Sequence, residues 1–214
     1  MRTDELIRAL AADADKSAPM PLSRALMLGL LPGLALSGLI YVLFVGPRPH
    51  LLALSTVEPR IAFKFLLSLA LAGCAGFMLL RLVRPGSDLR PALVLLLLVA
   101  LALIAGVIGE LMVLPHDLWA ARWIGHNSMH CLKTIPPLSA APFVAAFIVM
   151  RRGAPDHPAL AGAGIGLFAA AIGATIYATH CPDDSPLFVA TWYGIAIAGV
   201  TALGAIAGSR LLRW

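Results

Sequence analysis

Residues 92–114 read ALVLLLLVALALIAGVIGELMVL, an apolar run with a single ionisable side chain, Glu110. A helix needs about 20 consecutive apolar residues to cross the hydrocarbon core of a bilayer. The run is longer than this and contains no proline. We therefore predict that it crosses a membrane as a helix, and that the membrane decides the fold of the whole chain.

The composition extends this prediction to the rest of the chain. Of the 214 residues, 60% are apolar and 13% are charged, whereas soluble domains carry about 25% charged residues. Five further runs are expected to span the membrane, at residues 25–45, 61–82, 132–150, 159–179 and 187–212. The predicted fold class is all-α, a polytopic membrane protein in which residues 25–214 form one bundle of six transmembrane helices. The first run is too long for a signal peptide, so no processing is expected.

The fourth run is the least regular, because Pro136, Pro137 and Pro142 interrupt it. Inside a bundle, neighbouring helices can satisfy the carbonyl groups that a proline leaves free. Small residues spaced four apart predict close helix packing elsewhere, at Gly29/Gly33, Gly162/Gly166 and Gly204/Gly208.

Residues 1–24 form the one sizeable polar segment. Thr3 can cap a helix that runs from Asp4 to about Ala14. One face of this short amphipathic helix carries Leu6, Ile7 and Leu10. A helix of this length is marginal alone in water, so the face is expected to bind a partner.

The distribution of Lys and Arg predicts the orientation. If the N-terminus is cytoplasmic, that side holds Arg2, Arg8, Lys16, Arg24, Arg81, Arg84, Arg90, Arg151, Arg152, Arg210 and Arg213. The opposite side holds Arg48, Arg60, Lys64, Arg122 and Lys133. Cytoplasmic loops carry the excess of positive charge, so both termini are predicted to be cytoplasmic. The loops at 46–60, 115–131 and 180–186 then face outward. The net charge of +5 could suggest nucleic acid, but surplus Lys and Arg in the cytoplasmic loops of a membrane protein explain it better, so no direct nucleic-acid partner is expected.

Two of these outward loops each contain a His-Cys dipeptide, at residues 130–131 and 180–181. Cys131 and Cys181 have three interpretations: a structural disulfide, a metal or redox sensor site, or inert thiols. We favour the sensor, because a disulfide needs no histidine, whereas thiolate and imidazole together suit Cu(I) or Zn(II). The candidate ligands are Cys131, Cys181, His126, His130 and His180. No permanent cofactor is expected, only a transient soft metal ion.

Other polar residues near the outer ends of the spans have simpler interpretations. Lys64 and Glu110 lie inside spans and are expected either to pair with each other or to extend toward the membrane surface. Asp183, Asp184 and Ser185 are expected to form a turn and to cap the sixth span.

No enzyme signature stands out, because the chain has no Gly-rich phosphate loop, HExxH motif or nucleophile elbow. We therefore predict that it is not an enzyme. Two alternatives to a sensor remain, a membrane metal transporter or channel and a membrane thiol oxidoreductase. A transporter would need ligands through the depth of the membrane, and an oxidoreductase would need a cofactor or quinone pocket.

Three blocks carry a resemblance to a known family: RTDELI at residues 2–7, RWIGHNSMHCL at 122–132 and HCPDDSPLF at 180–188. The chain resembles the NrsF-type family, bacterial negative regulators of extracytoplasmic-function sigma factors, over essentially its whole length. The resemblance implies an anti-sigma factor in the bacterial inner membrane that holds its sigma factor there and releases it under heavy-metal or related stress. The family's two outward cysteines correspond to Cys131 and Cys181. Residues 1–24 become the expected sigma-factor-binding segment, and membrane lipid is the other expected partner.

Overall fold

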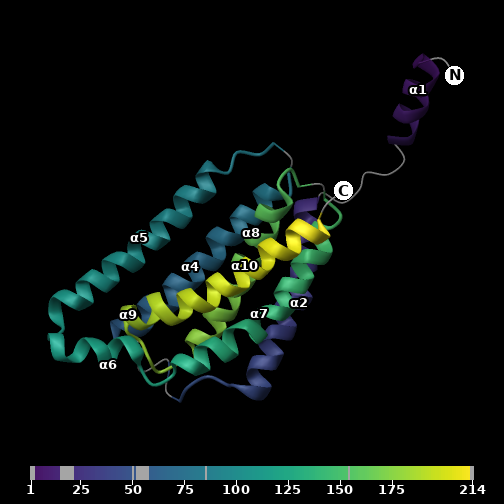
Figure 1. The fold of residues 1–214 in the computed structure, drawn as a ribbon. Helices are drawn as coiled ribbons and strands as arrows, with labels where there is room; N and C mark the ends of the chain where they lie inside the picture. The colour runs from purple at the N-terminus through teal and green to yellow at the C-terminus, as the bar shows by residue number, and fades with distance from the viewer. Residues whose placement is uncertain are drawn as a thin grey trace.

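A computed structural model describes residues 3–14, 22–49, 51, 58–84, 86–153 and 155–212. Among these residues all regular structure is helical, which confirms the all-α prediction. Figure 1 shows long helices side by side in a bundle, with α1 apart from it. The elements are α1 (Thr3–Ala14), α2 (Leu22–Phe44), α4 (Pro59–Leu82), α5 (Arg90–Val113), η1 (His116–Leu118), α6 (Trp119–Ile124), α7 (Ser128–Met150), α8 (Pro158–Ala178), α9 (Pro186–Phe188), η2 (Val189–Tyr193) and α10 (Gly194–Leu211).

Six of these helical segments are long and apolar enough to cross a membrane, as predicted. They are built on α2, α4, α5, α7, α8 and the run from α9 to α10. One boundary differs in a way that matters. The fourth span was expected to begin near residue 132, but α7 begins at Ser128, and the Cys131 N–H already bonds the Asn127 carbonyl at 2.9 Å. Cys131 therefore lies in the first turn of α7 rather than in a loop.

The most deeply buried spanning helix is α8, and α10 packs directly on it. A Cβ atom at Gly162 would overlap the carbonyl oxygen of Gly204, and one at Gly166 would lie 2.8 Å from the Cα of Thr201. This approach of two backbones is possible only between small residues. The close packing predicted for these glycines is confirmed, and it joins α8 and α10 into one unit.

The three prolines of α7 do not break it, and α7 is one helix from Ser128 to Met150. Pro142 has no N–H, so the carbonyl of Leu138 loses its usual partner within the helix. The Ser37 hydroxyl of α2 donates to that carbonyl at 2.6 Å, and the contact is buried. A neighbouring helix thus satisfies the freed group, as the sequence predicted.

The helix α5 lies at the edge of the bundle, where α4 is its main neighbour (Figure 1). Ala92 and Glu110 are its only buried residues. Its remaining surface is largely Leu, Ile and Val, so it is fit to face the hydrocarbon of a bilayer.

The N-terminal helix α1 begins at Thr3, one residue before the expected start, and ends at Ala14 as expected. The side chains of Leu6 and Ile7 are exposed. The side chain of Leu10 lies outside the described part of the structure.

Candidate functional site

Cys131 and Cys181 meet at one end of the bundle. Both side chains are fully buried, both are free thiols, and they interact directly with each other. We call them the thiol pair. They share an apolar cluster with Ile135, Tyr177 and Tyr193, so the surrounding protein shields both sulfur atoms from solvent.

The packing of α7 against α8 brings the pair together. Cys131 is in the first turn of α7, and the N–H of Cys181 bonds the Tyr177 carbonyl at 3.1 Å, just beyond the end of α8. Gly173 lets the two helices approach, because a Cβ there would lie 2.8 Å from the carbonyl oxygen of Ile135. The start of α7 and the end of α8 consequently occupy the same depth.

Two phenols lie against the thiol pair. The hydroxyl oxygens of Tyr177 and Tyr193 are buried without a nitrogen or oxygen partner among the described residues. Both side chains interact with Cys131 and Cys181. A buried hydroxyl normally has a partner, and the two cysteines are polar groups with which both phenols interact.

Lys64 of α4 closes the site from another side. Its side chain has no solvent exposure, and its ammonium group donates to the carbonyls of Cys181 at 2.6 Å and Asp183 at 3.2 Å. It also forms an ion pair with Asp184 at 2.6 Å. The expected pairing of Lys64 with Glu110 is therefore wrong. The turn after α8 folds over α4 and surrounds the ammonium with three oxygens, which are its partners in place of the Glu110 carboxylate.

Glu110 instead holds the start of the last span. Its carboxylate accepts from the Ser185 hydroxyl at 2.6 Å and from the Leu187 N–H at 3.3 Å, with Arg60 at 3.8 Å. Ser185 is the N-cap residue of α9, but its side chain makes no capping bond. The prediction that Asp or Ser caps this span is therefore wrong. The Ser185 hydroxyl donates to Glu110 instead, and the Glu110 carboxylate accepts from the Leu187 N–H in the first turn.

Asp183 and Asp184 connect the same turn to two further segments. One oxygen of Asp183 accepts from the N–H groups of His126 and Asn127 at 3.1 and 2.8 Å, and from the Asn127 side chain at 3.0 Å. Asp184 accepts from Arg48, which follows α2, at 3.0 Å. Residues 180–186 are thereby bonded to α4, to α5, to the chain after α2 and to the chain before α7.

The electrostatics favour a thiolate at Cys181. The hydrogen bond from the Cys131 thiol lowers the pKa of Cys181 to about 7, and the nearby Lys64 charge acts in the same direction against the effect of burial. The thiolate is the form of cysteine that binds metals and attacks oxidants.

The three candidate histidines do not gather around the thiol pair. The side chain of His126 is 95% exposed, and its Nδ1 lies 3.7 Å from Asp183. His130 is exposed, and Nδ1 of His180 lies 2.8 Å from the Gly46 carbonyl. Within the described residues, no three side chains of His, Cys, Asp or Glu are placed to hold one metal ion. The structure brings together Cys131 and Cys181 of the predicted set, and the role of the histidines stays a prediction.

Comparison with known proteins adds the family. The family model described as "Negative regulator of sigma F" (NrsF) matches residues 10–214. The anti-sigma-F factor NrsF of Caulobacter vibrioides is 34% identical, and the probable anti-sigma-F factor NrsF of Azospira oryzae is 33% identical; in both cases the whole of each chain is covered. No solved structure matches the chain significantly. These relatives are regulatory proteins and not enzymes. The chain belongs to the NrsF family of anti-sigma factors.

Proposed function

We propose that this chain holds an extracytoplasmic-function sigma factor at the cytoplasmic face of the bacterial inner membrane. The sigma factor is released when a thiophilic metal ion or an oxidant reacts with the thiol pair on the periplasmic side. The names of the two relatives support a sigma factor as partner. The excess of Lys and Arg on the side of the N-terminus supports the orientation.

The single observation that carries the proposal is the burial of two free thiols in contact at the end of the bundle opposite the end of α10. A structural core cysteine needs neither a reactive partner nor a buried ammonium beside it. Here each thiol has the other as its reactive partner, and Lys64 supplies the buried ammonium. The arrangement suits a site whose chemistry changes with conditions.

Two chemistries fit the pair. A soft ion such as Cu(I) prefers thiolate ligands and would take Cys131 and Cys181 as its first two. Zn(II) takes four ligands, so the exposed His126 and His130 and the engaged His180 would have to move to complete its shell. Alternatively, the two thiols form a disulfide. The two S–H bonds then break, an external oxidant accepts two electrons, and two protons are released.

Either reaction acts on a turn that is bonded to most of the bundle. Metal binding removes the thiol protons, and Cys181 is held by Lys64 through its own carbonyl. A change at the sulfur atoms therefore alters contacts to α4 and, through Ser185 and Glu110, to α5 and to α9. A stimulus shifts an equilibrium between two states only if it binds them differently, and we propose that the two states differ in this turn.

The partner-binding surface proposed here is α1. Leu6 and Ile7 are exposed on it, and the predicted face also includes Leu10. A short helix that orders on binding loses part of the interface energy to that ordering, which keeps the complex releasable.

Co-purification tests the proposal. The full chain, carrying an affinity tag and extracted in mild detergent, should retain an extracytoplasmic-function sigma factor of the same bacterium. The double variant Leu6→Asp, Leu10→Asp should lose it while still inserting in the membrane. Arg8→Gln, on the same helix but off the apolar face, is the matched control and should retain it. Full retention by the double variant would place the binding surface elsewhere.

A further inference from the structure

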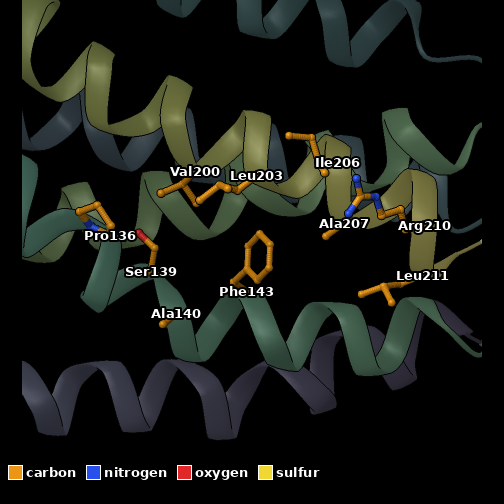
Figure 2. Close-up of a pocket in the computed structure, with 10 residues that line it drawn as sticks. All are labelled: Pro136, Ser139, Ala140, Phe143, Val200, Leu203, Ile206, Ala207, Arg210 and Leu211. Carbon is orange, nitrogen blue, oxygen red and sulfur yellow. The ribbon is translucent and has the colours of Figure 1, made fainter.

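A groove between α7 and α10 shares no lining residue with the apolar cluster around the thiol pair. Its volume is about 500 Å³. The groove is lined from α7 by Pro136, Ser139, Ala140 and Phe143, and from α10 by Val200, Leu203, Ile206, Ala207, Arg210 and Leu211. Figure 2 shows Pro136 near one end and Arg210 and Leu211 near the other.

The packing of the bundle keeps this groove open. The close contact of Gly162 with Gly204 fixes α10 on α8, and that of Gly173 with Ile135 fixes α7 on α8. The two helices are thus attached to a shared neighbour and cannot close on each other without giving up these contacts.

The groove offers an apolar surface with one charged end. The Ser139 hydroxyl already donates to the Ile135 carbonyl at 2.8 Å, so it is not free for a ligand. Leu203 and Ile206 remain more than half exposed on the α10 side. Arg210 is exposed, and no acidic side chain of the described residues forms an ion pair with it.

The length of the groove matches one leaflet of a bilayer. From Val200 to Leu211 a helix rises about 16 Å at ~1.5 Å per residue. Half of the hydrocarbon core is ~15 Å thick. An acyl chain in the groove would therefore place its headgroup at Arg210, which lies in the last turn of α10.

We propose that the groove between α7 and α10 binds one anionic phospholipid, its acyl chain against Phe143 and Leu203 and its phosphate on Arg210. The planar guanidinium group matches a phosphate with two parallel hydrogen bonds. Cytoplasmic leaflets are rich in anionic lipid, and this part of the argument rests on the orientation given under Proposed function. The bound chain also reaches Pro136, which follows Cys131 by little more than one turn of α7.

Native mass spectrometry of the full chain in a non-ionic detergent tests the site without any sigma factor. The probes are phosphatidylglycerol and phosphatidylcholine with identical acyl chains. The wild-type chain should retain one phosphatidylglycerol in preference to phosphatidylcholine. Arg210→Gln should weaken retention about tenfold, equivalent to ~1.4 kcal/mol, whereas Arg152→Gln, at the same end of the bundle but outside the groove, should not.

A second pair of variants tests the acyl-chain position. Ala140→Trp fills the groove and should abolish retention, while Val144→Trp, on an exposed position of the same helix, should leave it unchanged. Three results would each overturn the proposal. They are equal retention of both lipids by the wild-type chain, equal effects of Arg210→Gln and Arg152→Gln, and binding of a second protein chain in place of the lipid. If Ala140→Trp fails to fold, the comparison of Arg210→Gln with Arg152→Gln and the comparison of the two lipids still test the proposal. A failed lipid test leaves sigma-factor retention untouched, so the two proposals fail separately.

Discussion

Lys64 and Asp184 form an ion pair of 2.6 Å in which the lysine has no solvent exposure at all. Lysine is seldom fully buried without a partner, and here the ammonium also holds the carbonyls of Cys181 and Asp183. The pair fixes the position of the second thiol relative to α4.

Removal of this lysine should destabilise the protein strongly. Breaking one side of a buried pair costs about 3–5 kcal/mol, because the other charge loses its compensation. Lys64→Met should therefore lower the Tm of the purified protein in detergent. Arg60→Gln is the control, since Arg60 is one-third exposed and lies 3.8 Å from Glu110, so the loss of this longer contact should lower the Tm less than the loss of the buried lysine. A drop in Tm for Lys64→Met no larger than for Arg60→Gln would refute the structural role given to Lys64.

The crossing of α8 and α10 gives a second prediction. Gly204→Ala places a Cβ 3.0 Å from Gly166 and closer still to the Gly162 carbonyl. Overpacking of this kind costs about 1–3 kcal/mol, so the Tm should fall. Gly199→Ala adds the same methyl group to the same helix with nothing within 4 Å, and its Tm should stay at or slightly above wild type. Matching Tm values for both variants would show that α8 and α10 are not in close contact.

The thiol pair should titrate at an unusual pH. The pKa of Cys181 is about 7, lowered by the bond from Cys131 and by Lys64, against about 8.5 for a free cysteine. Raising the pH through 7 should therefore form one thiolate, visible in the ultraviolet absorbance of the protein. Cys131→Ala removes the thiol that donates to Cys181, so the transition should move to higher pH. Cys181→Ala removes the group that titrates, so the transition should disappear. A transition unchanged in Cys131→Ala would mean that the two thiols do not interact.

The orientation is tested with reporter fusions. Fusions after Ser87 and at the end of the chain should read cytoplasmic, and fusions near Asn127 and Asp184 should read periplasmic, because the cytoplasmic side should carry the excess of Lys and Arg. A cytoplasmic reading at Asn127 would place the thiol pair on the wrong side for a periplasmic stimulus.

The sequence predicted the fold well because hydrophobic length is a local property. The run at 92–114 predicts α5 without reference to any other part of the chain, and the spacing of Gly162 and Gly166 predicts a close helix crossing. The partner helices were not predictable in this way. That Ser37 of α2 satisfies the Leu138 carbonyl depends on which helices become neighbours, and this is settled by the whole bundle.

The site was predicted in part for the same reason. Repeated His-Cys dipeptides pointed to Cys131 and Cys181, but spacing along the chain does not fix where an imidazole lies, and the histidines lie elsewhere. Tyr177 and Tyr193 were missed because an aromatic residue in an apolar helix looks like ordinary core. Lys64 stood out as a charge inside a span, yet its partners come from a turn far along the chain.

Induction by a thiophilic metal in cysteine variants is the measurement that tests the central claim most directly. The cognate sigma factor should drive a reporter gene in cells that carry the wild-type chain, Cys131→Ser, Cys181→Ser, the double variant or Cys74→Ser. We predict that both single variants lose normal induction. The double variant should resemble either single variant, because the thiols act as a unit. Cys74 is half-buried in α4, and the Cys74→Ser variant should respond like wild type. Full induction by the metal in the Cys131→Ser, Cys181→Ser double variant would contradict the account.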